Sequence, residues 1–301
     1  MSSLRAASSG PAAGITRPAT VRTPTDRLVG RFLRNRLAAV SLAVLTAIHL
    51  AVILAPWVAP YNPDALELAN RFRAPNAQYW LGTDEYGRDV LTRLLFGGRV
   101  SLTVGLASMI ASMVLGVAVG ALAGYTGGVA DVLLMRLTDG MLSVPLFFVA
   151  LMALALLGAT IVNLVLVIAL SSWMTVARVV RAEVLRTREL EFVLAARALG
   201  CSPLRILARH VVPQSIPSIT VAATLGVAFA VLLETSLSFL GLGVQPPAAS
   251  WGNMLSGARG YLRTVPGLAF FPGALIFITV LCYNWFGDGL RDAIDPTLAE
   301  R

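Results

Sequence analysis

Residues 191–200 read Glu-Phe-Val-Leu-Ala-Ala-Arg-Ala-Leu-Gly, and Cys201-Ser202-Pro203 follow, in a stretch that closes at Pro213. Phe192, Ala195, Ala196 and Leu199 recur at helical spacing, which predicts a helix with one small, apolar face. Gly200 suits the left-handed residue that ends a helix, and Ser202-Pro203 suit the start of the next. The stretch therefore predicts two helices joined by a tight turn.

The second helix of this pair has its own pattern. Leu204, Leu207 and Val211 form an apolar stripe, while Arg205 and Arg209 face away from it. An alternative interpretation is a helical pair that lies on the membrane surface with its arginines near anionic lipid.

Composition places the chain in a membrane. Of its 301 residues, 56% are hydrophobic and 13% charged, with a mean hydropathy of +0.75. A helix needs about 20 apolar residues to cross the hydrocarbon core. Six segments qualify: Leu37–Val58, Ser101–Ala123, Met141–Leu157, Ile161–Val180, Ile216–Leu240 and Leu268–Phe286. The sequence therefore predicts an all-α integral membrane protein with six transmembrane helices.

The arginines predict the orientation, because basic residues in short flanking loops favour the cytoplasmic side. Residues 1–36 hold seven arginines against one aspartate, and residues 178–210 hold seven against three glutamates. Residues 59–100 hold five arginines and five acidic residues, a balance that fits the outside. With six spans, both termini are then cytoplasmic.

The predicted organisation follows from these assignments. A partly disordered basic tail (1–36) precedes the first transmembrane helix (37–58) and an external loop (59–100). In that loop Leu91, Leu94 and Leu95 predict an interfacial helix, with Asp89 and Arg93 paired four residues apart. The core (101–290) contains five spans and the loop 186–213, and residues 291–301 form a cytoplasmic tail.

Several function classes are excluded or disfavoured by residues that the chain lacks. It contains no lysine, so it carries no G-x-x-x-x-G-K-[ST] phosphate loop, and any ATP must be hydrolysed by a partner. It also lacks the G-x-S-x-G motif of a nucleophile elbow. Its two cysteines, on different elements, predict neither a disulfide nor a metal site. The net charge of +8 is explained by membrane topology, and we expect no nucleic-acid binding.

Two groups of charged residues near the spans are candidate functional residues. Glu234 lies in the outer part of the fifth span, where a carboxylate should face a cavity or a partner. It would meet a positively charged group of a solute, help to gate the outer mouth, or make a structural hydrogen bond. Arg136 and Asp139, three residues apart, predict an ion pair near the cytoplasmic side that serves either as a gate or as a plain surface pair.

Residues 191–213 resemble the EAA loop of ATP-binding-cassette importer permeases, in which Glu-Ala-Ala, three residues, Gly, nine residues and Ile-x-Leu-Pro follow one another. Ala195, Ala196, Gly200 and Pro213 match this pattern with the glycine-to-proline spacing intact. Leu194, His210 and Val212 depart from it, in a way similar to the oligopeptide/dipeptide branch.

Three other stretches resemble the same branch, which includes nickel and glutathione permeases. They are Leu81-Gly82-Thr83-Asp84-Glu85-Tyr86-Gly87-Arg88-Asp89-Val90-Leu91; the run from Glu234 through Pro246-Pro247 to Ser250-Trp251-Gly252; and the end of the chain, residues 287–296. The resemblance covers the chain from about Arg31 onward.

The resemblance implies a six-span permease in the cytoplasmic membrane of a bacterium. It implies four kinds of partner: a homologous second permease, two ATP-binding subunits, an external substrate-binding protein, and a peptide cargo moved by alternating access. The chain itself would bind no cofactor, because ATP and Mg²⁺ would act in the partner subunits.

The resemblance also implies roles for particular residues. The coupling contact with an ATP-binding subunit would be made by Glu191, Ala195, Ala196, Arg197, Gly200 and Pro213. Candidates for external docking are Asp84, Arg88 and Asp89. Two alternatives remain: the same architecture with nickel, glutathione or another small solute as cargo, and an ATP-independent channel or secondary transporter.

Overall fold

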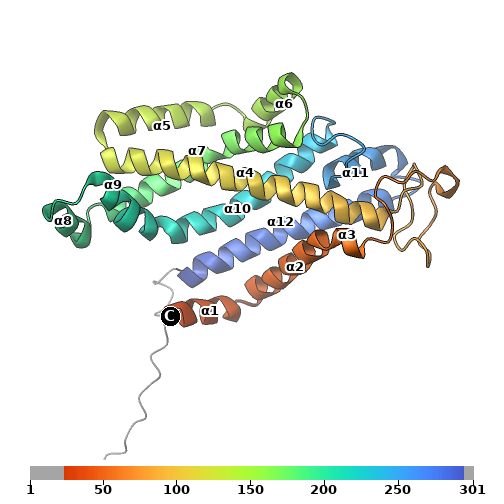
Figure 1. The fold of residues 1–301 in the computed structure, drawn as a ribbon, viewed down its shortest axis with the longest axis horizontal. Coiled ribbons are helices and arrows are strands. Elements are labelled where there is room, and N and C mark those ends of the chain that lie inside the picture. Colours follow the sequence, from red (N-terminus) through yellow and green to blue (C-terminus); the bar gives the residue numbers. More distant parts are fainter. Residues whose placement is uncertain (1–23, 295–301) are drawn as a thin grey trace, which may run out of the picture.

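The computed structural model describes residues 24–294 as a bundle of helices (Figure 1). Of the predicted tails, 1–36 and 291–301, residues 1–23 and 295–301 lie outside the described residues, whereas residues 24–34 and 291–294 are helical. Its α-helices are α1 (Pro24–Arg34), α2 (Arg36–Ile53), α3 (Ala55–Val58), α4 (Val90–Thr126), α5 (Gly128–Leu142), α6 (Leu146–Leu157), α7 (Ile161–Thr187), α8 (Glu191–Ala198), α9 (Pro203–Ile206), α10 (Val212–Phe239), α11 (Trp251–Ala258) and α12 (Gly267–Ile294).

The membrane-spanning character predicted from hydropathy is confirmed. Five segments in the described part of the chain are long and apolar enough to cross a membrane: α2, α4, α7, α12 and the continuous segment Pro203–Phe239. The helices α5 and α6 form a sixth when they are counted as one span bent by 81°. Large exposed apolar side chains such as Leu50, Leu156 and Phe277 fit a surface in contact with lipid.

The second span differs from its prediction at its start. The helix α4 begins at Val90, because the Asp89 side chain caps it by accepting a hydrogen bond from the Thr92 N–H at 2.8 Å. Leu94 is buried, so the expected interfacial helix is wrong: residues 90–100 are the first turns of the span itself. Arg93 and Arg99 lower the local hydropathy, which is why hydropathy alone places the start of the apolar segment at Ser101.

The first and third spans are each interrupted. A break at Leu54 separates α2 from α3, where Pro56 lies in the first turn and supplies no N–H. The segment predicted as Met141–Leu157 begins within α5, breaks before Pro145 and continues as α6 until Gly158, whose φ is 85°. Hydropathy averaged over the length of a span does not detect such local breaks.

A row of glycines brings α4 and α7 into close contact. Gly116, Gly120 and Gly124 recur every four residues and lie against α7. A Cβ atom built on Gly120 would lie 2.3 Å from the carbonyl oxygen of Ala177, so only glycine permits this separation of the two backbones. This is the small-residue packing by which helices associate in lipid.

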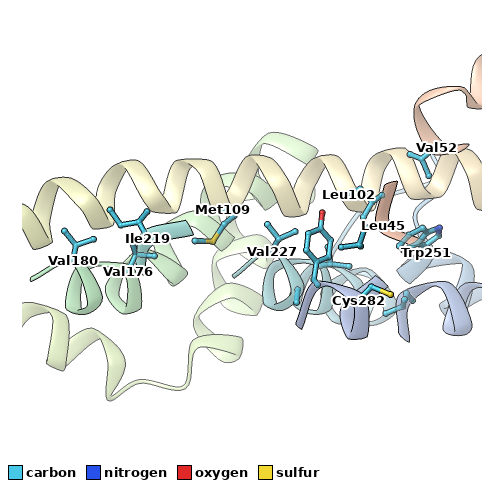
Figure 2. Packing of buried hydrophobic residues seen from close by; sticks show 14 of the residues in the cluster. Leu45, Val52, Leu102, Met109, Val176, Val180, Ile219, Val227, Trp251 and Cys282 are labelled. Atoms are coloured by element: carbon cyan, nitrogen blue, oxygen red, sulfur yellow. The ribbon is translucent and has the colours of Figure 1, made fainter. Parts of the chain in front are cut away.

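Buried side chains from several helices line one side of α4 (Figure 2). At one end of this row Trp251 of α11 is fully buried, and its indole N–H donates to the Leu94 carbonyl at 3.0 Å. A separate polar contact joins α2 to α12, where His49 Nε2 and the Tyr283 hydroxyl lie 3.1 Å apart. Because His49 Nδ1 is 2.8 Å from the Leu45 carbonyl, Nδ1 donates and Nε2 accepts.

Candidate functional site

The helices α8 and α9 lie at the end of the bundle opposite the loop that joins α3 to α4 (Figure 1). Gly200 has a φ of 78°, and the turn there has the Schellman pattern. The N–H of Cys201 bonds to the carbonyl of Ala196 at 3.1 Å, and the N–H of Gly200 to that of Arg197 at 3.0 Å. The predicted helix, glycine turn and second helix are therefore present, and Pro213 lies in the first turn of α10.

The apolar face expected on α8 is divided in the structure. Val193 and Ala196 pack inside the chain, with exposed fractions of 0% and 8%, whereas Phe192 and Leu199 are 42% and 84% exposed. Ala195 is exposed as well. The exposed part of the predicted face, which we call the α8 face, therefore consists of Phe192, Ala195 and Leu199. The expectation that Ala196 also lies on it is wrong.

The other residues expected in the coupling contact lie around this face. Glu191 and Arg197 are exposed on α8. On the second helix, Leu204 is exposed and Val211 buried, so the stripe predicted there is also divided. A π-helical turn, Leu207–Val211, leads from α9 into α10.

Two long-range contacts fix the ends of this loop to the bundle. Where α7 ends, the Arg188 guanidinium donates to the Gly124 carbonyl of α4 at 2.8 Å. One turn earlier, the Glu183 carboxylate accepts a hydrogen bond from the Ser218 hydroxyl of α10 at 2.9 Å. Sequence reasoning singled out none of these residues, because their partners are distant in the chain. Displacement of α8 would therefore reach α4, α7 and α10.

A cavity of about 1050 Å³ lies next to the Glu183–Ser218 contact. Its polar residues include Glu183, Arg186, Gln214 and Ser218, and the Arg186 guanidinium is 2.9 Å from the Glu183 carboxylate. Its remaining lining is largely apolar and comes mostly from α4, α5, α6, α7 and α10: Met109, Leu142, Leu146, Ser171, Ser172, Thr175, Val176, Val179, Pro217, Val221, Ala222, Leu225, Gly226, Phe229, Arg291 and Ile294.

Glu234 is not among the residues that line this cavity. Its side chain is fully buried, and one carboxylate oxygen accepts a hydrogen bond from Ser238 at 2.7 Å. The hydroxyls of Ser101 and Ser250 also interact with it. Of the three roles considered for Glu234, this arrangement favours the structural hydrogen bond, which ties α10 to α4 and to the start of α11.

The external docking candidates belong to a folded polar cluster. Asp84 is buried, lies 2.6 Å from the Arg88 guanidinium, and accepts the N–H groups of Tyr86 and Arg88. Arg93 lies 3.6 Å from Asp84, so the expected pairing with Asp89 is wrong; Asp89 caps α4 instead. Asp84, Arg88 and Asp89 therefore shape this loop from within, and a docking protein would meet little of their surface.

The expected pair between Arg136 and Asp139 is also wrong. Asp139 pairs with Arg178 of α7 at 2.5 Å, and both side chains are about half exposed. A stronger contact lies nearby, where the Arg181 guanidinium binds the Asp131 carboxylate through two hydrogen bonds of 2.5 and 2.6 Å. These pairs hold α5 alongside α7. Within residues 24–294, no three histidine, cysteine or acidic side chains form a group that fits a metal ion.

Known proteins match most of the chain. Residues 116–300 match the family described as binding-protein-dependent transport system inner membrane component, and residues 23–76 match the N-terminal transmembrane domain of oligopeptide transport permease C. A putative peptide permease of Brucella suis is 44% identical over 275 residues and covers 91% of both chains. A nickel transport system permease of Escherichia coli is 41% identical and covers 89% of this chain and 97% of its own.

The fold also has a solved counterpart. The methionine ABC transporter MetNI in an inward-facing conformation matches with a TM-score of 0.54, over 67% of this chain and 97% of the matched chain. At 19% identity this likeness concerns the fold alone.

Proposed function

This chain belongs to the family of inner membrane components of binding-protein-dependent transport systems, and we propose how it works as one permease of such an importer. It is a membrane-spanning permease subunit of the ATP-binding-cassette importer type, in the oligopeptide/dipeptide/nickel branch, as its sequence motifs indicated. We place it in the cytoplasmic membrane of a bacterium, with both termini and α8 in the cytoplasm. Its partners are a homologous second permease, two ATP-binding subunits and an external substrate-binding protein.

The observation that carries the mechanism is the α8 face. It presents Phe192, Ala195 and Leu199 at one end of the bundle, while Val193 and Ala196 anchor the same helix to the chain. An apolar patch on a short helix suits a groove on an ATP-binding subunit. The lack of lysine supports dependence on an ATP-binding partner, because ATP and Mg²⁺ must then be bound by that partner.

The contacts at the ends of the loop 186–213 connect α8 to the helices that move during transport. When the ATP-binding subunits close, they displace α8. The bond from Arg188 to Gly124 passes this displacement to α4, and the contact between Glu183 and Ser218 passes it between α7 and α10. The cavity that α7 and α10 line changes shape as a result. Alternating access then follows from two arrangements of these helices, selected by the nucleotide state of the partner.

We assign peptides as the cargo. The support is the relative named as a peptide permease and the N-terminal match to an oligopeptide permease. The cavity agrees with this cargo, because its apolar walls suit side chains and the polar groups Glu183 and Arg186 suit peptide termini. Nickel is the second candidate, favoured by the relative named as a nickel permease.

Uptake by the assembled transporter tests this assignment. The chain would be purified with its co-expressed partners and reconstituted in liposomes, with radiolabelled dipeptide or nickel outside and ATP inside. We expect ATP-dependent accumulation of the dipeptide that disappears when the ATP-binding subunits are omitted. Accumulation of nickel alone would replace the cargo, and uptake by this chain without ATP would overturn the importer mechanism.

A further inference from the structure

The helix α1 stands apart from the transport machinery described above. It ends at Arg34, and the Asn35 side chain accepts a hydrogen bond from the Ala38 N–H to start α2 as a separate helix. Val29, Phe32 and Leu33 lie on one side of α1, at successive spacings of three and one, whereas Arg34 falls on the other. The helix is therefore amphipathic, and its apolar side extends beyond the part that contacts the bundle.

Contacts with α12 fix how α1 is rolled. The Phe32 ring packs edge-on against Phe286 with centroids 5.5 Å apart, and the Arg31 guanidinium donates to the Asp292 carbonyl at 3.2 Å. This orientation leaves Val29 58% and Leu33 57% exposed. These two side chains form an apolar edge that the described part of the chain does not cover.

That edge continues the surface of a membrane span. The next exposed apolar side chains along the sequence are Leu37 and Val40 of α2, at 54% and 55% exposure. The helix α2 is apolar enough to cross the membrane, so lipid covers Leu37 and Val40. The lipid-facing surface therefore continues to Leu33 and Val29 at the level where α2 begins.

The charge of the residues around this apolar edge indicates which lipid covers it. Arg34 and Arg36 are exposed at the junction of α1 and α2, and residues 1–36 carry seven arginines against one aspartate. A helix with an apolar edge and an arginine-rich polar side lies in the membrane interface, and its arginines attract anionic headgroups. We infer that α1 is an interfacial anchor that binds anionic phospholipid in the leaflet at the N-terminal end of α2, and that it thereby holds α2 and α12 together.

Depth-dependent quenching tests the placement of the helix. The full chain would carry Leu33→Cys in a Cys201→Ser background, labelled with a fluorophore, in phosphatidylcholine/phosphatidylglycerol vesicles that contain lipid with a nitroxide near the carbonyl region. Cys282 is buried at 4% exposure and does not compete for the label. The control is Arg34→Cys on the polar side, where the wild-type side chain is also exposed. We expect quenching at position 33 to exceed that at position 34 several-fold.

Equal quenching at the two positions, or none at either, would overturn the inference. Absence of quenching would indicate instead that water covers this edge. Because the measurement needs no transport, its outcome is separate from that of the importer mechanism.

Lipid binding tests the charge. Native mass spectrometry of the full chain in an uncharged detergent, titrated with phosphatidylglycerol or phosphatidylcholine, would compare the wild type with Arg34→Gln/Arg36→Gln. Each arginine near an anionic surface contributes an attraction that corresponds to about fivefold in affinity, so the double variant should bind phosphatidylglycerol roughly 25-fold more weakly. The matched control is Arg99→Gln/Arg263→Gln, at two exposed arginines outside α1. Equal affinity for the two lipids, or an unchanged double variant, would refute the anchor.

Discussion

The glycine row between α4 and α7 makes a quantitative prediction for Gly120→Val. An added Cβ would lie 2.3 Å from the Ala177 carbonyl oxygen and 2.9 Å from the Val180 Cβ, whereas ordinary contacts begin at 3.4 Å. Because the first clash is with backbone, no rotamer change relieves it, and the helices must separate by about 1 Å. A gap of that size removes a quarter to a half of each dispersion contact along the interface.

Overpacking of this kind lowers the free energy of unfolding by about 1–3 kcal/mol. Because the clash is with backbone, we expect about 3 kcal/mol for Gly120→Val, which is on the order of 100-fold in the unfolding equilibrium. The apparent melting temperature, measured as the monodisperse fraction that survives heating in detergent, should fall by about 6 °C or more. The control is Gly140→Val in α5, where a Cβ meets nothing within 4 Å. If the two variants melt within about 1 °C of each other, the close-packing argument is wrong.

Three other contacts predict distinct results. Glu234→Gln should retain transport, since an amide oxygen still accepts a hydrogen bond, whereas Glu234→Ala should destabilise the chain by about 2–4 kcal/mol; loss of transport in a stable glutamine variant would show that the charge matters. Asp131→Asn should destabilise the chain by about 1–3 kcal/mol, because it weakens the bidentate bond to Arg181 that joins α5 to α7. An unchanged melting temperature would contradict the importance of that bond. Tyr283→Phe should lower the free energy of unfolding by about 0.6–2 kcal/mol, because it removes the hydroxyl that donates to His49. An equal effect in a His49→Phe background would show that the two residues do not interact.

The sequence predicted the apolar spans and the helix–turn–helix of residues 191–213, because both depend on local signals. Apolar runs of about 20 residues reveal spans, and a glycine followed by a serine and a proline reveals the turn. The start of α4 was misplaced because Arg93 is buried among acidic side chains of the preceding loop, a tertiary contact that a hydropathy window counts only as charge.

Long-range partners account for the other errors. Asp139 pairs with Arg178, 39 residues away, and a spacing rule can propose only the local Arg136. Periodicity likewise identified the apolar side of α8 but not which edge the chain would bury. That choice depends on how α8 packs against the rest of the chain, and it places Val193 and Ala196 inside while Ala195 stays outside.

The α8 face is the centre of the mechanism, and transport per ATP hydrolysed tests it most directly. The assembled transporter would be compared with Ala195→Glu, which places a charge on the exposed face, and with Ala196→Glu, which places one inside the chain. We predict that Ala195→Glu leaves the melting temperature of the isolated chain unchanged but releases or uncouples the ATP-binding subunits, whereas Ala196→Glu lowers that melting temperature. An Ala195→Glu transporter with wild-type subunit binding and wild-type transport per ATP would contradict the account.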